Sequence, residues 1–262
     1  SLSVRYQQIY KGEEAVPLPE DAYQGADIME HAKAFAGLYG DKYLAVSEEE
    51  RQEELVKYAL PINIANLERD LGAYRIHYDV WFRESSLYQS NEVQKCIDLL
   101  TERGYTYKQD GTLFYKATAF GAEKDDVLVR QNGVPTYFAA DIAYHYNKFA
   151  VRGFDKVINI LGADHHGHVA RLQNAMDAIG LDGSKLDIVL MQLVKLVRNG
   201  ELVKVSKRTG KSITLTDLLD EVPLDAARFF FNMREANSQM DFYLDLAIDT
   251  SSNNPVYYVQ YA

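Results

Sequence analysis

The later half of this chain alternates between strand-like and helical segments, and this alternation constrains the fold more than any other feature. Val157–Leu161 is a short apolar run that predicts a buried strand, Val169–Ile179 has helical spacing, and Ile188–Val197 predicts the next strand. A further helix is predicted from about Ala140 to Phe149. Strands that alternate with helices in this way are typical of a parallel sheet with helices on its faces. We therefore predict an α/β chain that contains the second half of a doubly wound, Rossmann-like parallel sheet.

The part of the chain before this alternation is predicted to be mostly helical and carries no obvious chemistry. Ser47 and Glu50 form a capping-box pattern that predicts the start of a long helix, and Pro61 is expected to kink or restart that helix. Two dipeptides, Asp110-Gly111 and Asn132-Gly133, each lie between strand-like runs. Both predict type I′ hairpins, because such turns need positive φ angles at their two central residues.

The composition argues against several classes of protein. One cysteine, Cys96, is too few for a disulfide framework and is typical of a reducing cytoplasm. No run of about 18 apolar residues is present, so no membrane-spanning helix is expected. The formal net charge of −10 argues against a surface dedicated to clamping nucleic acid, although it does not exclude local basic patches.

A lysine-rich segment from Lys204 to Gly210 reads Lys-Val-Ser-Lys-Arg-Thr-Gly. The ammonium groups of Lys204 and Lys207 suit the β- and γ-oxygens of a nucleotide, and Ser206 adds a hydroxyl group. Gly210 would let the loop close over those oxygens. Taken alone this pattern is a weak signal, because many surface loops have a similar sequence.

The predicted strand Val157–Leu161 is followed by a turn at residues 162–168, which reads Gly-Ala-Asp-His-His-Gly-His. A turn with a glycine at the carboxyl end of a parallel strand is where α/β sheets bind ligands. Its histidines and aspartate are also metal-ligand types, but no His-x-x-Glu or Cys-x-x-Cys partner is present and we predict no metal site. The triplet Asp164-His165-His166 is shared with the DHH phosphoesterases, which also need an Asp-x-Asp motif that this chain lacks.

Tyr137 and Asp141 lie four residues apart, where the helix after the second hairpin is expected to begin. If the helix begins near Phe138, both side chains point toward one opening, and the helix dipole keeps the carboxylate ionised. Such a carboxylate could accept a two-pronged bond from a guanidinium group. From the spacing alone a structural explanation is favoured, in which Asp141 supports its own helix and Tyr137 packs on the sheet.

Together these motifs resemble the arginyl-tRNA synthetase family in its bacterial form. The lysine segment is similar to the K-M-S-K-S loop of class I synthetases, with Val205 at the Met position, and the Gly162 turn is similar to their G-x-D-x-x-x-H turn. Residues 137–145 match the family pattern Tyr-x-x-x-Asp-Ile-Ala-Tyr-His. The resemblance covers the whole chain and is strongest from Leu113 onward.

The resemblance implies an arginine–tRNA ligase. Arginine and ATP would form arginyl-adenylate and pyrophosphate, and the arginyl group would then pass to the 3′ end of tRNA(Arg). ATP with Mg²⁺ is implied as a substrate, no tightly bound cofactor is expected, and the enzyme is expected to be a cytoplasmic monomer. The resemblance implies that arginine is bound by Tyr137, Asp141 and His165. It implies that ATP is bound by Gly162, Asp164, His168 and Val205. Catalysis, by stabilising the departing pyrophosphate, is implied for Lys204, Ser206 and Lys207.

Compared with the family, the chain is expected to be a fragment. The H-I-G-H signature of the ATP site is not found in it, and the helical anticodon-binding domain is expected to follow it. Residues 1–111 are interpreted as a helical connective insert, 112–216 as the second half of the nucleotide-binding catalytic domain, and 217–262 as a helical segment leading toward the anticodon-binding domain. We expect the chain to be inactive alone. The alternative is a non-catalytic structural or binding module derived from a synthetase.

Overall fold

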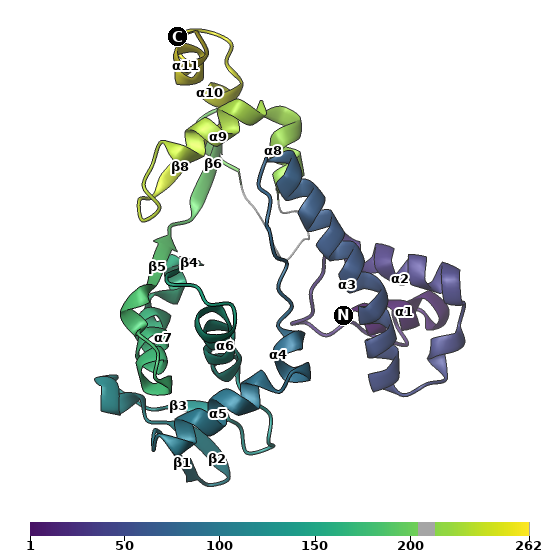
Figure 1. The fold of residues 1–262 in the computed structure, drawn as a ribbon. Coiled ribbons are helices and arrows are strands. Elements are labelled where there is room, and N and C mark those ends of the chain that lie inside the picture. The colour runs from purple at the N-terminus through teal and green to yellow at the C-terminus, as the bar shows by residue number, and fades with distance from the viewer. Residues whose placement is uncertain (204–212, 262) are drawn as a thin grey trace. The chain divides into compact units, whose positions relative to one another are not determined.

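The computed structural model describes residues 1–203 and 213–261. Contacts divide the chain into two compact units, which are described separately (Figure 1). Unit 1 consists of residues 1–78, 195–233 and 241–262, and unit 2 consists of residues 79–194 and 234–240. The domain boundaries predicted at 111/112 and 216/217 divide the chain in another way and stay predictions.

The N-terminal part of unit 1 is built from three helices around a core rich in aromatic residues. The helices are α1 (Leu2–Lys11), α2 (Ala26–Tyr39) and α3 (Glu48–Ala73), with a short 3₁₀ helix at Lys42–Leu44. Their buried residues Tyr6, Ala32, Phe35, Tyr43 and Leu55 form one cluster. The predicted cap of α3 is confirmed, because Ser47 Oγ accepts a hydrogen bond from Glu50 N at 3.1 Å.

Pro61 lies inside α3 without ending it, so the predicted restart is wrong. A proline in a helix removes one hydrogen bond, and the other bonds of this 26-residue helix keep it continuous. A buried arginine also anchors the helix. Arg51 Nε donates to Ser3 Oγ at 3.0 Å, Arg51 Nη1 donates to the Tyr43 carbonyl at 3.0 Å, and the guanidinium pairs with Glu48. A buried charge is tolerated when it is paired and hydrogen-bonded in this way.

In the described residues, the remainder of unit 1 contains a small three-stranded sheet and four short helices. The strands are β6 (Val194–Arg198), β7 (Glu201–Leu202) and β8 (Met240–Tyr243), in the order β7-β6-β8. The helices are α8 (Leu215–Glu221), α9 (Leu224–Asn232), α10 (Leu244–Ile248) and α11 (Pro255–Tyr261). Phe230 of α9 packs on Phe242 of β8 with ring centroids 5.7 Å apart. This contact joins helix and sheet.

Unit 2 begins with two helices and a three-stranded antiparallel sheet. These elements are α4 (Ser85–Gln89), α5 (Glu92–Glu102), β1 (Thr106–Gln109), β2 (Thr112–Tyr115) and β3 (Asp126–Val129), with a 3₁₀ helix at Ala117–Phe120 between β2 and β3. Asp110 and Gly111 have φ angles of 49° and 77°, which confirms the first predicted hairpin.

The second half of unit 2 contains the parallel strands that the sequence predicts. Helix α6 (Tyr137–Tyr146) continues into a π-helical segment (Asn147–Val151), and β4 (Val157–Gly162) leads through a 3₁₀ turn (Ala163–His165) into α7 (His166–Ile179). A further 3₁₀ turn (Gly183–Lys185) precedes β5 (Leu186–Met191). Strand β5 pairs with β4 in parallel, from Val157↔Leu186 to Gly162↔Met191, so α7 is the crossover helix of a βαβ unit.

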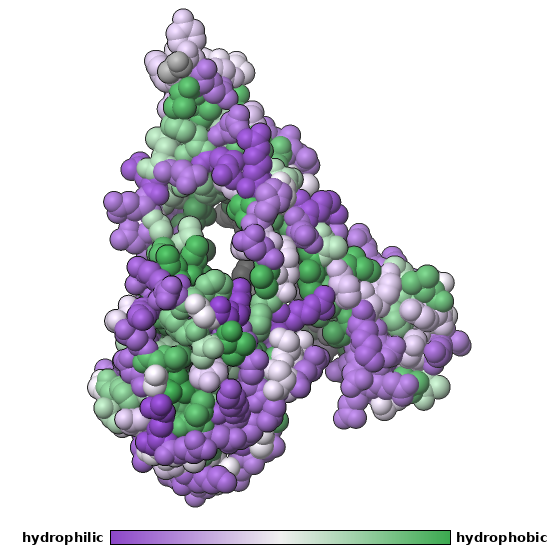
Figure 2. Space-filling model, viewed as in Figure 1, coloured by the Kyte–Doolittle hydropathy of each residue, from purple (hydrophilic) through white to green (hydrophobic). Residues whose placement is uncertain are grey.

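Strand β4 is buried on one face only, so the prediction of a fully buried strand is wrong. Val157 is buried, whereas Ile158 and Ile160 are 59% and 66% exposed. Val189 and Met191 of β5 are exposed as well. Figure 2 shows hydrophobic residues at the surface in the region where Figure 1 labels β4 and β5. Parallel sheets normally carry helices on both faces, and among the described residues only one face of this pair is covered.

Two further predictions about strands need correction. The strand predicted from Ile188 to Val197 is divided between β5 and β6, which belong to different sheets. Between them, Gln192 N donates to the Ala236 carbonyl at 2.9 Å instead of extending the parallel ladder. The second predicted hairpin is shorter than expected. Val129 and Pro135 pair in an isolated antiparallel bridge, but Asn132 lacks the positive φ angle of a type I′ turn, and α6 begins soon after.

Two fully buried tyrosines allow a test of this packing. Tyr115 on β2 is 0% exposed and its hydroxyl has no hydrogen-bond partner in the described part of the chain. Because an unsatisfied buried polar group costs about 1–3 kcal/mol, Tyr115→Phe should raise the free energy of unfolding by about 1 kcal/mol. Chemical denaturation of the two proteins measures this change.

Tyr6 is the matched control. It is also 0% exposed, but its hydroxyl donates to the Gly40 carbonyl at 2.6 Å and accepts from Tyr43 N at 3.3 Å. Tyr6→Phe should therefore lower the free energy of unfolding by about 1 kcal/mol. Equal destabilisation by both substitutions would show that the Tyr115 hydroxyl is satisfied.

Candidate active site

Helix α6 begins one turn before Asp141 and places two of the predicted site residues. Thr136 caps it, because its Oγ1 accepts from Ala139 N at 3.4 Å and donates to the Val127 carbonyl at 2.7 Å. Tyr137 is therefore the first helical residue, and it is 78% exposed rather than packed on the sheet. Asp141 lies in the second turn, so the predicted support from the helix dipole is wrong, since that effect is confined to the first turn.

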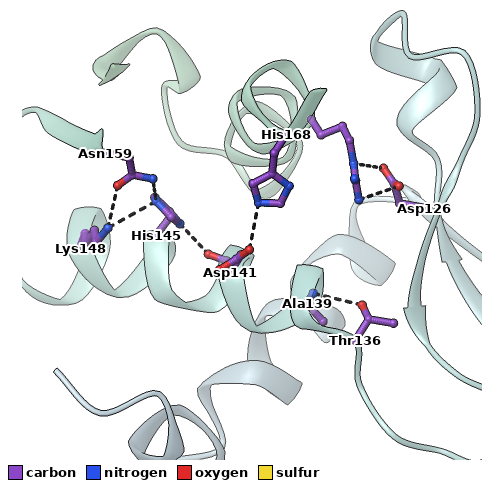
Figure 3. Close-up of polar contacts among 9 residues, drawn as sticks. Asp126, Thr136, Ala139, Asp141, His145, Lys148, Asn159 and His168 are labelled. Carbon is purple, nitrogen blue, oxygen red and sulfur yellow. Dashed lines mark hydrogen bonds and ion pairs between the residues drawn. The ribbon is translucent and has the colours of Figure 1, made fainter. Parts of the chain in front are cut away.

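A histidine from the next helix holds the Asp141 carboxylate instead. His168 Nε2 donates to Asp141 Oδ2 at 2.9 Å (Figure 3), and the side chains are 21% and 41% exposed respectively. Asp141 Oδ1 has no hydrogen-bond partner among the described residues. The contact orients the carboxylate and leaves one oxygen available to a ligand.

His168 is itself positioned by packing at the start of α7. The Phe138 ring lies edge-on to its imidazole, with centroids 5.8 Å apart. One turn later, Arg171 forms a two-pronged ion pair with Asp126 of β3, at 3.0 Å for Nε and 2.8 Å for Nη2, and its guanidinium lies 4.5 Å from the Phe138 ring centroid. Side chains from β3, α6 and α7 thereby fix the position from which His168 donates.

A chain of hydrogen-bonded polar side chains starts at the backbone carbonyl of Asp141 and runs through α6, the π-helical segment and β4 (Figure 3). His145 Nδ1 donates to the Asp141 carbonyl at 2.7 Å, so its Nε2 is free to accept from Asn159 Nδ2 at 2.6 Å. Asn159 Oδ1 accepts in turn from Lys148 Nζ at 3.0 Å. These bonds join α6 to β4, and they fit only a neutral imidazole with its proton on Nδ1.

The environment of this chain lowers the pKa of both basic groups. Burial, and next the positive charge of Lys148, hold the pKa of His145 below its usual value. Burial, and next the charge of Arg152, lower the pKa of Lys148 to about 8. The partly buried ammonium of Lys148 is therefore only weakly favoured at neutral pH.

Tyr88, at the end of α4, is a neighbour of the site that no sequence motif identified. Its pKa is raised first by burial and then by the nearby groups Glu84, Tyr137 and Asp141. The tyrosine is still 44% exposed. It therefore lies close enough to Tyr137 and Asp141, two of the predicted arginine ligands, to be affected by their charge. A lone tyrosine in a five-residue helix carries no pattern that could have revealed this.

The turn after β4 places the remaining described candidates. A Cβ on Gly162 would come within 2.5 Å of Asp164 Oδ1, so the absence of a side chain lets Asp164 fold back over the strand end. The Asp164 and His165 side chains are 82% and 57% exposed, and His165 Nε2 lies 3.7 Å from Asp164 Oδ2. Because His168 follows closely and contacts Asp141, this turn lies beside α6. No metal-binding group of three or more His, Cys, Asp or Glu side chains occurs in the described ranges.

Four predicted residues lie outside the described residues: Lys204, Val205, Ser206 and Lys207. The described segments on either side, β7 and α8, belong to unit 1, whereas all of the other candidates belong to unit 2. The roles of these four residues stay predictions. No described helix is long and apolar enough to cross a membrane.

Comparisons with known proteins point to one family. The family described as "tRNA synthetases class I (R), catalytic domain" matches residues 41–243. Over 262 residues, the chain is 58% identical to an arginine–tRNA ligase from Acetivibrio thermocellus and 59% identical to one from Caldanaerobacter subterraneus. In both comparisons all of this chain aligns with 46% of the relative's length.

Solved structures agree with this result. A Campylobacter jejuni arginyl-tRNA synthetase superimposes with a TM-score of 0.88 at 33% identity, covering 100% of this chain and 56% of that one. An arginyl-tRNA synthetase from Thermus thermophilus matches with a TM-score of 0.70 at 17% identity, covering 99% of this chain and 54% of that one, and supports the fold alone.

The polar chain next to Asp141 predicts a specific pH dependence. The folded-state pKa of His145 is lowered, so between that pKa and the usual value of about 6.5 the unfolded chain binds more protons. The free energy of unfolding should therefore rise with pH through this window and fall on acidification. His145→Gln should flatten this part of the curve, measured by denaturation at a series of pH values.

NMR of the imidazole provides an independent check. We expect the His145 signal, assigned by its loss in His145→Gln, to show a proton on Nδ1 at neutral pH and a titration midpoint below about 6.5. A midpoint at or above that value would contradict the buried, neutral state of the ring.

Proposed function

Because the chain belongs to the class I arginyl-tRNA synthetase family, as the match over residues 41–243 establishes, we propose that it forms part of the catalytic core of an arginine–tRNA ligase. The chain spans 46% of the length of the relatives described above, so the activity proposed is that of the longer protein. Arginine and ATP would give arginyl-adenylate and pyrophosphate. The arginyl group would then pass to tRNA(Arg).

The observation that carries this proposal is the oriented carboxylate of Asp141. His168 holds Oδ2, and Oδ1 is left without a partner in the described part of the chain, on a side chain that is 41% exposed. A guanidinium is a planar cation whose N–H groups match carboxylate oxygens. Oδ2 retains a second lone pair, so both oxygens can still accept from the substrate. In this proposal Asp141 selects arginine by charge and shape.

Tyr137 and His165 complete the arginine site in this proposal. Both are exposed and lie near the ends of α6 and α7 that the His168–Asp141 bond brings together. In this proposal Tyr88, which lies near Tyr137 and Asp141, lines another side of the arginine site. The aromatic side chains would exclude water around the guanidinium, and a drier site strengthens its attraction to the carboxylate.

ATP would lie beside the turn after β4. Gly162 allows close approach of the nucleotide, the exposed Asp164 suits ribose hydroxyls, and His168 would border the nucleotide while it holds Asp141. The Val205 backbone would lie near the adenine. Lys204, Ser206 and Lys207 would stabilise charge on the departing pyrophosphate, with Mg²⁺ bound to ATP. We also propose a cytoplasmic monomer.

Chemistry of this type requires no covalent nucleophile from the protein. The substrate carboxylate attacks the α-phosphate, and the protein contributes orientation and charge stabilisation. The rigid contacts from Asp126 through Arg171 and Phe138 to His168 suit that role, because small displacements of an oriented group reduce the rate strongly.

Replacement of the selecting carboxylate tests the proposal. In the full-length protein, Asp141→Asn should lower kcat/KM for arginine by roughly tenfold to a hundredfold, because a charged hydrogen bond is worth about 1.5–3 kcal/mol. Asparagine keeps an oxygen that can accept from His168, so the fold should persist. The assay is arginine-dependent ATP–pyrophosphate exchange with tRNA present.

Asp110→Asn is the matched control. Asp110 lies in the hairpin turn between β1 and β2 with a φ angle of 49°, and Asn-Gly serves a type I′ turn as well as Asp-Gly. This variant should retain wild-type kinetics. Near wild-type kinetics in Asp141→Asn would remove the carboxylate from arginine recognition.

The chain alone should not attach arginine to tRNA. In a doubly wound sheet the nucleotide lies where the two halves meet. Among the described residues, β4 pairs only with β5, and Ile158 and Ile160 remain exposed. A charging assay should show no arginyl-tRNA above a no-enzyme control with this 262-residue chain, and clear product with the full-length protein. Charging by the chain alone would mean that these residues suffice.

A further inference from the structure

A polar cavity lies at the opposite end of α6 from Tyr137. Its volume is about 330 Å³, and it is lined by the side chains of Tyr144, Lys148, Arg152, Phe154 and Lys156 and by the beginning of β4. All of these residues belong to unit 2. Three cations therefore surround one cavity in a chain whose formal net charge is −10.

Two of these cations have no carboxylate partner. Lys156 pairs with Asp187 at 2.6 Å. Lys148 and Arg152 form no ion pair within the described residues, and the charge of Arg152 helps to lower the pKa of Lys148. The C-terminal end of α6 supports positive charge there, yet the two cations still repel each other. An anion in the cavity would relieve this repulsion.

The lysine is held in place by polar neighbours. Lys148 Nζ donates to Asn159 Oδ1 at 3.0 Å and lies 3.4 Å from His145 Nε2 (Figure 3). An ammonium group has three N–H donors. At least one donor of Lys148 is therefore left for a ligand, on a side chain whose position is already fixed.

The aromatic residues contact the cations, and Tyr144 has no free face for a nucleobase. Lys148 Nζ lies 4.1 Å from the Tyr144 ring centroid, and Phe82 stacks on the same ring at 4.5 Å and 26°. A stacked ring and an ammonium cannot share one face, so both faces of Tyr144 are covered. The Arg152 guanidinium lies 4.8 Å from the Phe154 ring centroid. Base recognition needs an open aromatic face, and Tyr144 offers none, whereas the cations that line the cavity present N–H donors.

We propose that this cavity binds a phosphate group through Arg152, Lys148 and Lys156. Guanidinium and ammonium donors converging on one cavity match the oxygens of a phosphate. The phosphate could belong to an RNA backbone or to free phosphate or pyrophosphate, and the experiment separates these sources. The cavity shares no lining residue with the proposed arginine site, which lies nearer the start of α6.

Substitution of Arg152 tests the proposal on the purified chain. The probes are inorganic phosphate, pyrophosphate and a fluorescent RNA hairpin, with binding measured by calorimetry and by fluorescence anisotropy at several salt concentrations. Arg152→Gln should weaken phosphate binding roughly tenfold or more. Arg152→Lys should recover part of the affinity. If RNA is the source of the phosphate, Arg152→Gln should also make RNA binding less dependent on salt. The slope of the logarithm of the association constant against the logarithm of the salt concentration should fall in magnitude by about one.

Lys124→Gln is the matched control, because it removes one positive charge from an exposed loop of the same unit. It should leave the affinities for phosphate and RNA unchanged. Loss of phosphate affinity without a change in RNA affinity identifies free phosphate as the ligand, and loss of both identifies the RNA backbone. Absence of phosphate binding, or equal binding by Arg152→Gln and wild type, overturns the proposal.

A separate comparison distinguishes this site from the proposed arginine site. Asp141→Asn should leave phosphate affinity unchanged, whatever its effect on arginine-dependent exchange in the full-length protein. Loss of phosphate affinity in Asp141→Asn would assign the anion to the site around Asp141 and would overturn the assignment to the cavity.

Discussion

The hydrogen bond from His168 to Asp141, at 2.9 Å, is the contact on which the candidate site depends. Without it, a half-exposed carboxylate in the second turn of α6 would sample several rotamers, and the turn after β4 would have no polar link to that helix. The bond is partly exposed to solvent, so its contribution to stability is modest. Its importance is geometric, because it fixes the position of a charged acceptor on α6 relative to the start of α7.

The rigidity of this contact comes from its surroundings. Arg171 is bound to Asp126 by two nitrogens and covers the Phe138 ring, and Phe138 packs against the imidazole of His168. Each of these side chains comes from an element with its own buried face, so the site inherits the order of the core of unit 2. Sites built on packed elements hold their geometry more closely than sites built on loops.

Local rules predicted the parts of the fold that local interactions determine. The cap at Ser47, the Asp110-Gly111 turn and the parallel strands joined by α7 follow from residue types and spacing. The failures have two causes: α3 continues through Pro61 because its other helical bonds hold it, and the strand predicted across Gln192 divides because its backbone bonds to Ala236. The candidate site shows the same limit. Spacing drew attention to Tyr137 and Asp141 but favoured a structural role for them, and only the family resemblance implied arginine binding. Neither the bond from His168 nor the proximity of Tyr88 could follow from a local pattern, since each joins separate elements.

Helix α6 has side chains of opposite charge toward its two ends. The half nearer its start presents a carboxylate held by a neighbouring helix, and its end presents cations above aromatic rings. The hydrogen-bonded chain through His145 and Asn159 joins the Asp141 carbonyl to the Lys148 ammonium. In each of its bonds the donor lies on the side nearer Lys148 and the acceptor on the side nearer Asp141. A proton added to His145 Nε2 would face the Asn159 amide and the Lys148 ammonium, and both contacts would become repulsive. The bonds that join α6 to β4 therefore suit a neutral imidazole. The ring that holds the Asp141 carbonyl is kept neutral first by burial and next by the charge of Lys148.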